Sequence, residues 1–95
     1  METQHTGGRE EGMFYSEKEG KRVAAITYSP GGNDVIVIDH TEVDRSLRGQ
    51  NIGYELVQKV AEYARAEGIK VSPVCPFAAA IFEKKPELQD VLAAP

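Results

Sequence analysis

The chain has 95 residues, of which 41% are hydrophobic and 27% are charged, and its formal net charge is −4. This composition is enough for one soluble domain with a single core, whereas broad nucleic-acid binding needs a basic surface that an acidic chain does not offer. The single cysteine excludes an internal disulfide and a cysteine-cluster metal site.

No apolar run approaches the ~20 residues that span a bilayer, and the polar N-terminus does not resemble a signal peptide. We therefore expect a cytoplasmic protein with no membrane or nucleic-acid partner and no metal, present as a monomer or weak homodimer. Residues 1–12 contain no large hydrophobic side chain after Met1, which is typical of a disordered tail. The folded domain is expected to span residues 13–95.

Three strands are expected at the start of this domain. Apolar patterns begin near residues 13, 21 and 35, and the segments 17–20 and 29–34 have the composition of turns. Strands joined by such short turns favour an antiparallel meander.

The third strand, residues 35–43, changes character along its length. Its first four residues are apolar on both faces, which predicts that both faces are covered there. Because side chains alternate between the two faces of a strand, His40 and Glu42 are predicted to lie on the face of Ile36 and Ile38. The polar end of the strand is therefore expected to leave the core and enter a cleft or water.

Residues 45–54, with the sequence RSLRGQNIGY, connect this strand to the best helix pattern in the chain. A glycine-bearing turn that opens a helix aims backbone N–H groups and the positive end of the helix dipole at one point. Arg45 and Arg48 add positive charge beside it. The pattern predicts a phosphate or pyrophosphate site, and the alternative is a connection in which glycine only supplies a tight turn.

The remaining elements are a helix, a strand and a second helix. Apolar residues recur at helical spacing over residues 51–67, and Gly68 is suited to a left-handed helix end. Residues 69–74 predict a fourth strand parallel to the third, and Pro76 opens a helix over residues 77–84. The expected fold class is α/β (α+β), with a twisted, mixed, mainly antiparallel sheet, a long crossover helix and a short C-terminal helix.

Three segments in this order resemble the GNAT superfamily of N-acetyltransferases, and within it the small stand-alone YjdJ-type members. They are His-Thr-Glu-Val at residues 40–43, Arg-Gly-Gln-Asn-Ile-Gly at 48–53 and Cys-Pro-Phe-Ala at 75–78. The resemblance covers residues 13–92. It implies a GNAT-like fold that holds acetyl-coenzyme A (acetyl-CoA) as acyl donor between splayed third and fourth strands.

The resemblance also implies a binding site for this donor. The diphosphate is expected on the amides of residues 48–53, and the pantetheine arm along Glu42 and Val43. Asn51 stands where the family prefers glycine, but asparagine tolerates left-handed backbone angles. The implied cofactor-binding residues are Val43, Arg45, Arg48, Gly49, Gln50, Asn51, Ile52, Gly53 and Tyr54.

Three residues are candidates for catalysis. His40 or Glu42 is a candidate base for an amine acceptor, and the alternative is an ordinary hydrogen bond at a strand end. Cys75 precedes a helix whose dipole favours a thiolate, so it is a candidate for an acetyl-cysteine or for the proton donor to coenzyme A. The alternative is a small core thiol. Family members often have a tyrosine on this helix, where the chain has Phe77 and Phe82.

The predicted function is transfer of an acetyl group from acetyl-CoA to an unidentified small-molecule or protein amine, by direct attack or through an acetyl-cysteine. Larger family members wall the acceptor site with helices between their first two strands. This chain has only a turn there, so an open acceptor site is expected. The alternatives are a catalytically silent coenzyme A-binding or sensing module, and a small protein-interaction domain without a cofactor.

Overall fold

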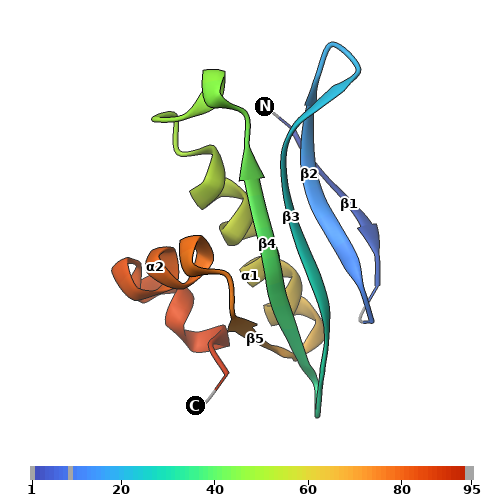
Figure 1. The fold of residues 1–95 in the computed structure, drawn as a ribbon. Coiled ribbons are helices and arrows are strands. Elements are labelled where there is room, and N and C mark those ends of the chain that lie inside the picture. The colour runs from blue at the N-terminus through green and yellow to red at the C-terminus, as the bar shows by residue number, and fades with distance from the viewer. Residues whose placement is uncertain (1, 9, 94–95) are drawn as a thin grey trace.

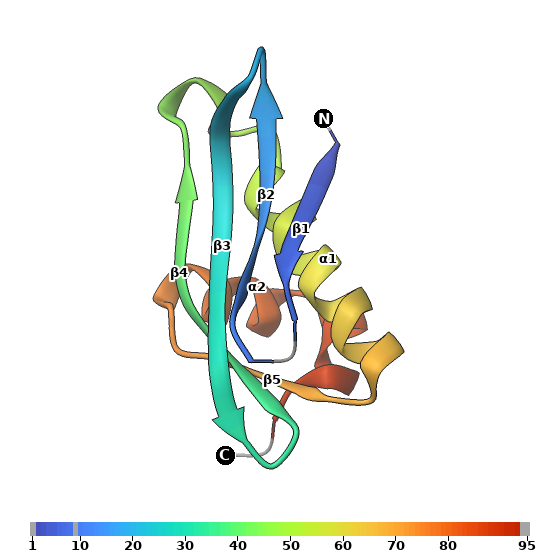
Figure 2. The ribbon, with the colours of Figure 1, turned by 90° about the vertical axis from the view of Figure 1, so that its right-hand side faces the viewer.

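The computed structural model describes residues 2–8 and 10–93, which form a five-stranded sheet with helices on one face (Figures 1 and 2). Its strands lie side by side in chain order, and β4 and β5 are the parallel pair. The predicted fold class is confirmed. The strands are β1 Thr3–Gly7, β2 Gly12–Lys18, β3 Lys21–Gly32, β4 Val35–Val43 and β5 Lys70–Pro73.

Two α-helices cross the sheet, α1 Ile52–Glu67 between β4 and β5 and α2 Pro76–Lys84 after β5. Short 3₁₀ segments, η1 Arg45–Leu47 and η2 Pro86–Val91, precede α1 and follow α2. Gly68 has φ 69° and its N–H donates to the carbonyl of Ala64, so it ends α1 in the left-handed conformation that the sequence predicts.

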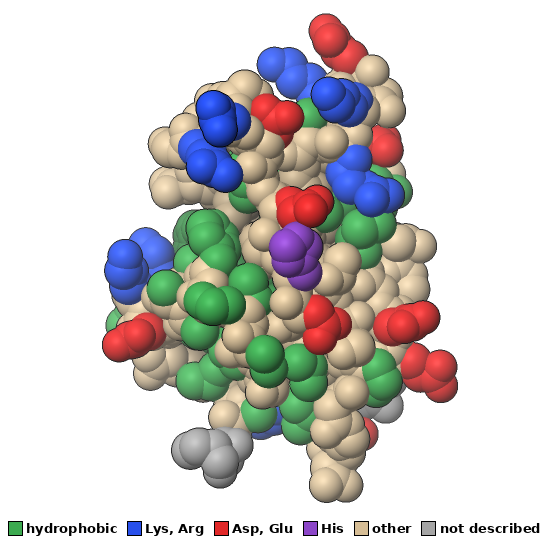
Figure 3. Space-filling model, viewed as in Figure 1, with side chains coloured by type: hydrophobic (Ala, Val, Ile, Leu, Met, Phe, Trp, Pro, Cys, Tyr) green, Lys and Arg blue, Asp and Glu red, His purple; other side chains and the backbone are tan. Residues whose placement is uncertain are grey.

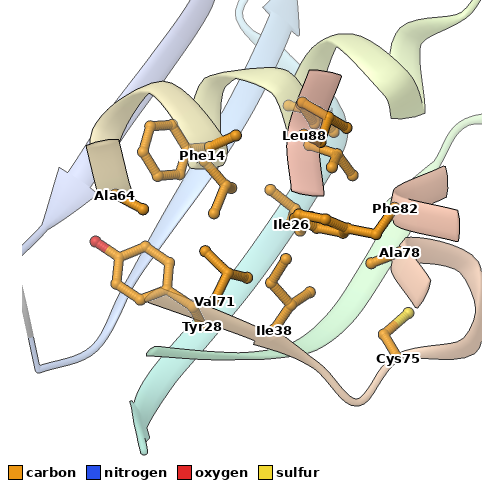
Figure 4. Packing of buried hydrophobic residues seen from close by; sticks show 14 of the residues in the cluster. Phe14, Ile26, Tyr28, Ile38, Ala64, Val71, Cys75, Ala78, Phe82 and Leu88 are labelled. Carbon is orange, nitrogen blue, oxygen red and sulfur yellow. The ribbon is translucent and has the colours of Figure 1, made fainter. Parts of the chain in front are cut away.

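The core lies between the helices and one face of the sheet (Figure 4). Ile26 and Ile38 from the sheet, Leu56 from α1 and Phe82 from α2 are all at most 1% exposed. Burying each such side chain stabilises the fold by about 1.5–3 kcal/mol. This packing holds β4, the start of α1 and α2 in fixed relative positions.

The opposite face of the sheet carries no helix among the described residues, and it faces the viewer in Figure 2. Val35 and Val37 on this face are only partly buried. The expectation that β4 is covered on both faces is therefore wrong, because α1 and α2 both pack on the same side.

The N-terminal segment differs from the predicted disordered tail. Residues 3–7 form β1, which pairs antiparallel with β2. The His5 ring stacks on Phe14 with centroids 4.1 Å apart and meets the edge of Tyr63 at 4.7 Å. Its Nε2 lies 2.7 Å from the Tyr28 hydroxyl. A histidine stacked on core aromatic rings anchors this strand without any large aliphatic residue. Residues 1 and 9 lie outside the described residues.

Acidification should weaken this anchoring. Burial lowers the pKa of His5 below its ordinary value of 6.5, so the folded chain binds this proton less readily than the unfolded chain. The stability linked to neutral His5 is complete above that value and is lost as the pH falls through the lower folded pKa. Thermal unfolding between about pH 7.5 and pH 5 should show a larger fall in Tm for the wild type than for His5→Phe. An equal fall in both proteins would contradict this account.

A β-bulge corrects the predicted facing of the β4 residues. Thr27 pairs with His40 but Tyr28 pairs with Ile38, so Asp39 is one extra residue in β4. Because alternation shifts by one at this point, His40 and Glu42 lie on the face opposite Ile38 rather than on its face. Thr41 instead turns toward the helices, where it contacts Cys75.

The turn between β3 and β4 is tighter than predicted. Strand β3 continues through Pro30 to Gly32, with a second register shift. Asn33 and Asp34 form the turn with φ 47° and 61°, and asparagine and aspartate are among the residues that tolerate these angles.

Candidate functional site

The site begins where β4 loses its pairing with β5, although it stays paired with β3 to Val43. β5 pairs with β4 from Val35 to Ile38, and there the N–H groups of Val74 and Cys75 both donate to the Ile38 carbonyl. The chain then turns into α2, so the described pairing with β5 does not extend to residues 39–43. Strands β4 and β5 therefore separate, as the resemblance implies.

A cleft of about 690 Å³ opens beside the part of β4 that β5 does not pair. Its lining comes from the inner side of β4, the turn before α1, the start of α1 and one side of α2. Three lining residues are cationic, and none of the described lining residues is acidic. The lining consists of Thr41, Val43, Leu47, Arg48, Gly49, Asn51, Ile52, Gly53, Tyr54, Phe77, Ile81, Lys84 and Lys85.

The turn before α1 is built by local hydrogen bonds. Asp44 accepts from the backbone N–H and the hydroxyl of Ser46 at 2.9 and 2.7 Å and starts η1. These hydrogen bonds, helped by the charges of Lys21 and Arg48, lower the pKa of Asp44. Asp44 therefore stays ionised, caps η1 and fixes the backbone that leads into the turn.

The start of α1 lies in the wall of the cleft and has backbone N–H groups without helical acceptors. Gly49 has φ 88° and Asn51 has φ 60°, and Asn51 precedes the helix without a side-chain capping hydrogen bond. Asn51 thus adopts a left-handed backbone angle that asparagine tolerates, and its side chain does not cap the helix. The first N–H groups of an α-helix have no acceptor within the helix, so those of residues 52–54 remain available for an anion.

Gly53 has a packing role as well. A Cβ at this position would clash with the ring of Phe77, which is 47% exposed and lines the same cleft. The missing side chain lets α2 approach the start of α1 closely. The spacing of the glycines in residues 48–53 indicated a tight turn but did not reveal this contact.

Seven of the nine predicted cofactor-binding residues line the cleft. Val43, Arg48, Gly49, Asn51, Ile52, Gly53 and Tyr54 lie in its wall. Arg45 and Gln50 do not line it, because they belong to η1 and to the turn that carries the chain past it. Glu42 lies on the other face of β4 because of the bulge, so Thr41 takes the place beside Val43 that was expected for Glu42.

The sequence of Glu83, Lys84 and Lys85 indicates an ordinary charged face from which a lysine could contact the nucleotide of the cofactor, but sequence reasoning did not place Phe77 and Ile81 in the cleft. Phe77, Ile81, Lys84 and Lys85 recur at spacings of four, three and one residues. That spacing places them on one side of a helix and was a usable pattern, but it indicates a shared side without showing what the side faces.

Cys75 lies at the junction of β5 and α2, 8% exposed, beside Ala78 and Ile38 (Figure 4). Its Sγ is 3.5 Å from the Thr41 hydroxyl. Burial raises the pKa of the thiol, but hydrogen bonds from the Ala78 backbone, the Thr41 side chain and the Phe77 backbone outweigh it and lower the pKa overall. The start of α2 thus favours the thiolate, one side chain away from the cleft.

His40 and Glu42 lie on the opposite face of β4. His40 Nε2 is 3.1 Å from a carboxylate oxygen of Glu42, and the two side chains are 62% and 71% exposed. They line a shallow groove of about 460 Å³ with Arg22 and Asp44. Thr41, Val43 and Arg48 border both this groove and the cleft. The two openings therefore meet at the end of β4 that β5 does not pair.

Within residues 2–8 and 10–93 no group of three or more His, Cys, Asp or Glu is placed to hold a metal ion. In the same part of the chain, no helix is long and apolar enough to cross a membrane.

Comparison with known proteins identifies the family. The model of the GCN5-related N-acetyltransferase family matches residues 13–91. A GCN5-like N-acetyltransferase candidate from Staphylococcus aureus, solved by NMR, is 35% identical with a TM-score of 0.74, and the match covers 97% of this chain and 89% of that one. A comparison with curated proteins gave no match.

More distant structures share the fold. The ribosomal-protein-S18-alanine N-acetyltransferase of Escherichia coli is 18% identical with a TM-score of 0.66, over 82% of this chain and 53% of that one. A streptothricin acetyltransferase candidate from Bacillus anthracis, solved with acetyl-CoA, is 15% identical with a TM-score of 0.62, over 79% and 46%. The chain spans about half the length of these two proteins.

The family model covers most of the chain, and the Staphylococcus aureus protein is similar over nearly the whole of both chains. The chain therefore belongs to the GCN5-related N-acetyltransferase family and is an acetyltransferase.

Proposed function

We propose that the cleft between β4, the start of α1 and α2 binds acetyl-CoA and that the acetyl group passes to an amine entering from the groove on the other face of β4. The observation that carries this proposal is the start of α1. There, uncapped N–H groups and Arg48 border a cleft whose described lining includes no acidic side chain. This arrangement fits a diphosphate.

The rest of the lining fits an acyl-pantetheine arm. Val43, Leu47, Ile52, Phe77 and Ile81 supply apolar wall between the anion site and the unpaired end of β4. The backbone of β4 beyond Ile38, unpaired on the β5 side, offers hydrogen-bonding groups to an extended amide chain, as sheet edges do. The thioester then lies near Thr41, where the two openings meet.

For direct attack, the His40–Glu42 pair is placed to take the proton. An amine that attacks the thioester carbon forms a C–N bond, must lose one proton, and releases coenzyme A as a thiol when the C–S bond breaks. His40 lies on the acceptor face of β4, and Glu42 orients its imidazole. Histidine is the side chain best suited to exchange a proton near neutral pH.

A two-step route is favoured by a separate observation, the lowered pKa of Cys75. In this route the Cys75 thiolate takes the acetyl group from coenzyme A, and the amine then attacks the acetyl-cysteine. The Cys75 Sγ is on the cofactor side of β4, in contact with Thr41. In the direct route the same thiol is the proposed group that protonates the departing thiolate.

The acceptor remains either a small amine or an amine of a protein. The groove beside His40 is shallow and lies on the uncovered face of the sheet, which suits an acceptor that brings its own bulk, such as a chain terminus or a lysine. The lone reduced cysteine fits a cytoplasmic location. The narrower relation to YjdJ-type proteins stays a prediction.

A titration with coenzyme A, followed by amide chemical shifts and thermal unfolding, tests the proposal. The largest shifts should fall on residues 48–54, Thr41 and Val43. A hundredfold excess over Kd should raise stability by about 2.7 kcal/mol. Turnover of acetyl-CoA with a panel of amines then identifies the class of acceptor. No shift at saturating coenzyme A would contradict the cleft as the binding site.

A further inference from the structure

The side of α2 that borders the cleft changes chemistry along the helix. Phe77 and Ile81 lie on the part nearer Cys75. Lys84 is the last residue of α2, and Lys85 is its C-cap. In Figure 3 hydrophobic side chains gather over α2, and Lys or Arg side chains lie at the outer end of the same helix. A ligand lying along this side meets apolar wall first and positive charge at its far end.

Lys85 lies close to the turn at residues 48–53, where the diphosphate is proposed to bind. Its Nζ lies 4.7 Å from the centre of the Tyr54 ring, a cation–π contact. The Tyr54 hydroxyl donates to a carboxylate oxygen of Glu87 at 2.7 Å, which fixes the ring between the two charged side chains. Tyr54 directly follows Gly53, so the Lys85 ammonium sits beside the end of the turn that faces the diphosphate.

The cations of the cleft thus form two groups on different walls. Arg48 lies at the turn before α1, and Lys84 and Lys85 lie at the end of α2. The uncapped amides and Arg48 already supply donors for a diphosphate. The lysines, at the end of α2 away from Cys75, are positioned for a further anionic group.

We propose that Lys84 and Lys85 form a second anion site that takes the 3′-phosphate of coenzyme A, so that the chain selects coenzyme A over dephospho-coenzyme A. The proposal rests on acetyl-CoA binding in this cleft, as proposed above. Coenzyme A carries this phosphate on the ribose next to the diphosphate, at the end of the molecule opposite the thioester. The order thioester, pantetheine, diphosphate and 3′-phosphate then matches the order Cys75, Phe77 with Ile81, the α1 turn, and the two lysines.

Calorimetric titration with coenzyme A and with dephospho-coenzyme A tests this site, because the two ligands differ only in the 3′-phosphate. The wild type should bind coenzyme A about 10-fold or more tightly, as expected for a charge-assisted contact. In Lys84→Gln/Lys85→Gln the Kd for coenzyme A should rise until the two ligands bind about equally. The Kd for dephospho-coenzyme A should stay within about twofold of the wild type. Added salt should narrow the preference of the wild type.

Lys59→Gln is the matched control, since it removes the same charge from the exposed side of α1, where Lys59 lies 3.7 Å from Glu62. It should leave both Kd values unchanged. Lys85→Gln alone should show a smaller loss of preference. Equal affinity of the wild type for both ligands, or an equal loss for both in the double variant, would overturn the second anion site while leaving the cleft intact. A wild type that binds neither ligand would instead overturn the proposed function, and this site with it.

Discussion

Cys75→Ala should lower kcat for acetyl transfer by about 100-fold or more, the scale of loss for a missing nucleophile or general acid, with little change in the Kd for coenzyme A. The Cys75 thiol contacts Thr41 and the start of α2 rather than the turn at residues 48–53. The variant should therefore lower kcat without changing the Kd for coenzyme A. Steady-state kinetics and a coenzyme A titration of the same preparation measure the two effects.

Mass spectrometry distinguishes the two roles of the thiol, and Cys75→Ser is the variant that disturbs the packing of this position least. A serine keeps the volume and the hydrogen bonds to the α2 amides but is a far weaker nucleophile and acid. Mass spectrometry of the wild type, incubated with acetyl-CoA without acceptor, should show an acetyl group on the Cys75 peptide if the two-step route operates. If no acetyl group accumulates and His40→Ala removes most of kcat, the direct route is supported. Full activity in Cys75→Ala would contradict both roles.

Because Cys75 is 8% exposed, Cys75→Ala also needs a stability control. Thermal unfolding of each Cys75 variant should show a single cooperative transition near that of the wild type. A kcat loss in a variant whose fold and Kd for coenzyme A are intact then reports on chemistry.

Arg48→Ala should raise the Kd for coenzyme A about 10- to 100-fold, the range of a lost charged hydrogen bond of about 1.5–3 kcal/mol. Arg48 borders the cleft at the turn where the diphosphate is proposed to bind. Pantetheine has no diphosphate, so its Kd should change little. Titrations of both ligands measure the difference.

Arg45→Ala is the matched control for this effect. It removes the same charge from the same turn, but Arg45 does not line the cleft, so its effect on the Kd for coenzyme A should be much smaller. Similar losses in Arg45→Ala and Arg48→Ala would indicate a general effect of charge on the turn. Equal losses for coenzyme A and pantetheine in Arg48→Ala would move the diphosphate elsewhere.

Local sequence patterns predicted the elements that carry the site. The helical spacing before Gly68 located α1, Pro76 located the start of α2, and the crossover predicted the parallel pair of β4 and β5. These predictions succeeded because helix periodicity, helix ends and crossover connections depend on residues close in the sequence.

The errors arose where a feature depends on distant residues. β1 was missed because His5 is anchored by Phe14, Tyr28 and Tyr63, contacts that composition does not show. The predicted face for the His40 side chain was wrong because one extra residue, Asp39, shifts the alternation of side chains along β4. A bulge is set by how two strands pair, so a single strand pattern does not reveal it.

The sequence by itself determined the class of the fold, the glycine-bearing turn at residues 48–53 that opens α1 and the placing of Cys75 at a helix start, since each follows from residues within a few positions of one another. The tertiary structure alone decided that Thr41 rather than Glu42 faces the cleft, that Gly53 accommodates Phe77, and that Lys84 and Lys85 line the same cleft as Arg48. Those relations join elements separated along the chain, and they exist only after α1 and α2 pack against the same face of the sheet.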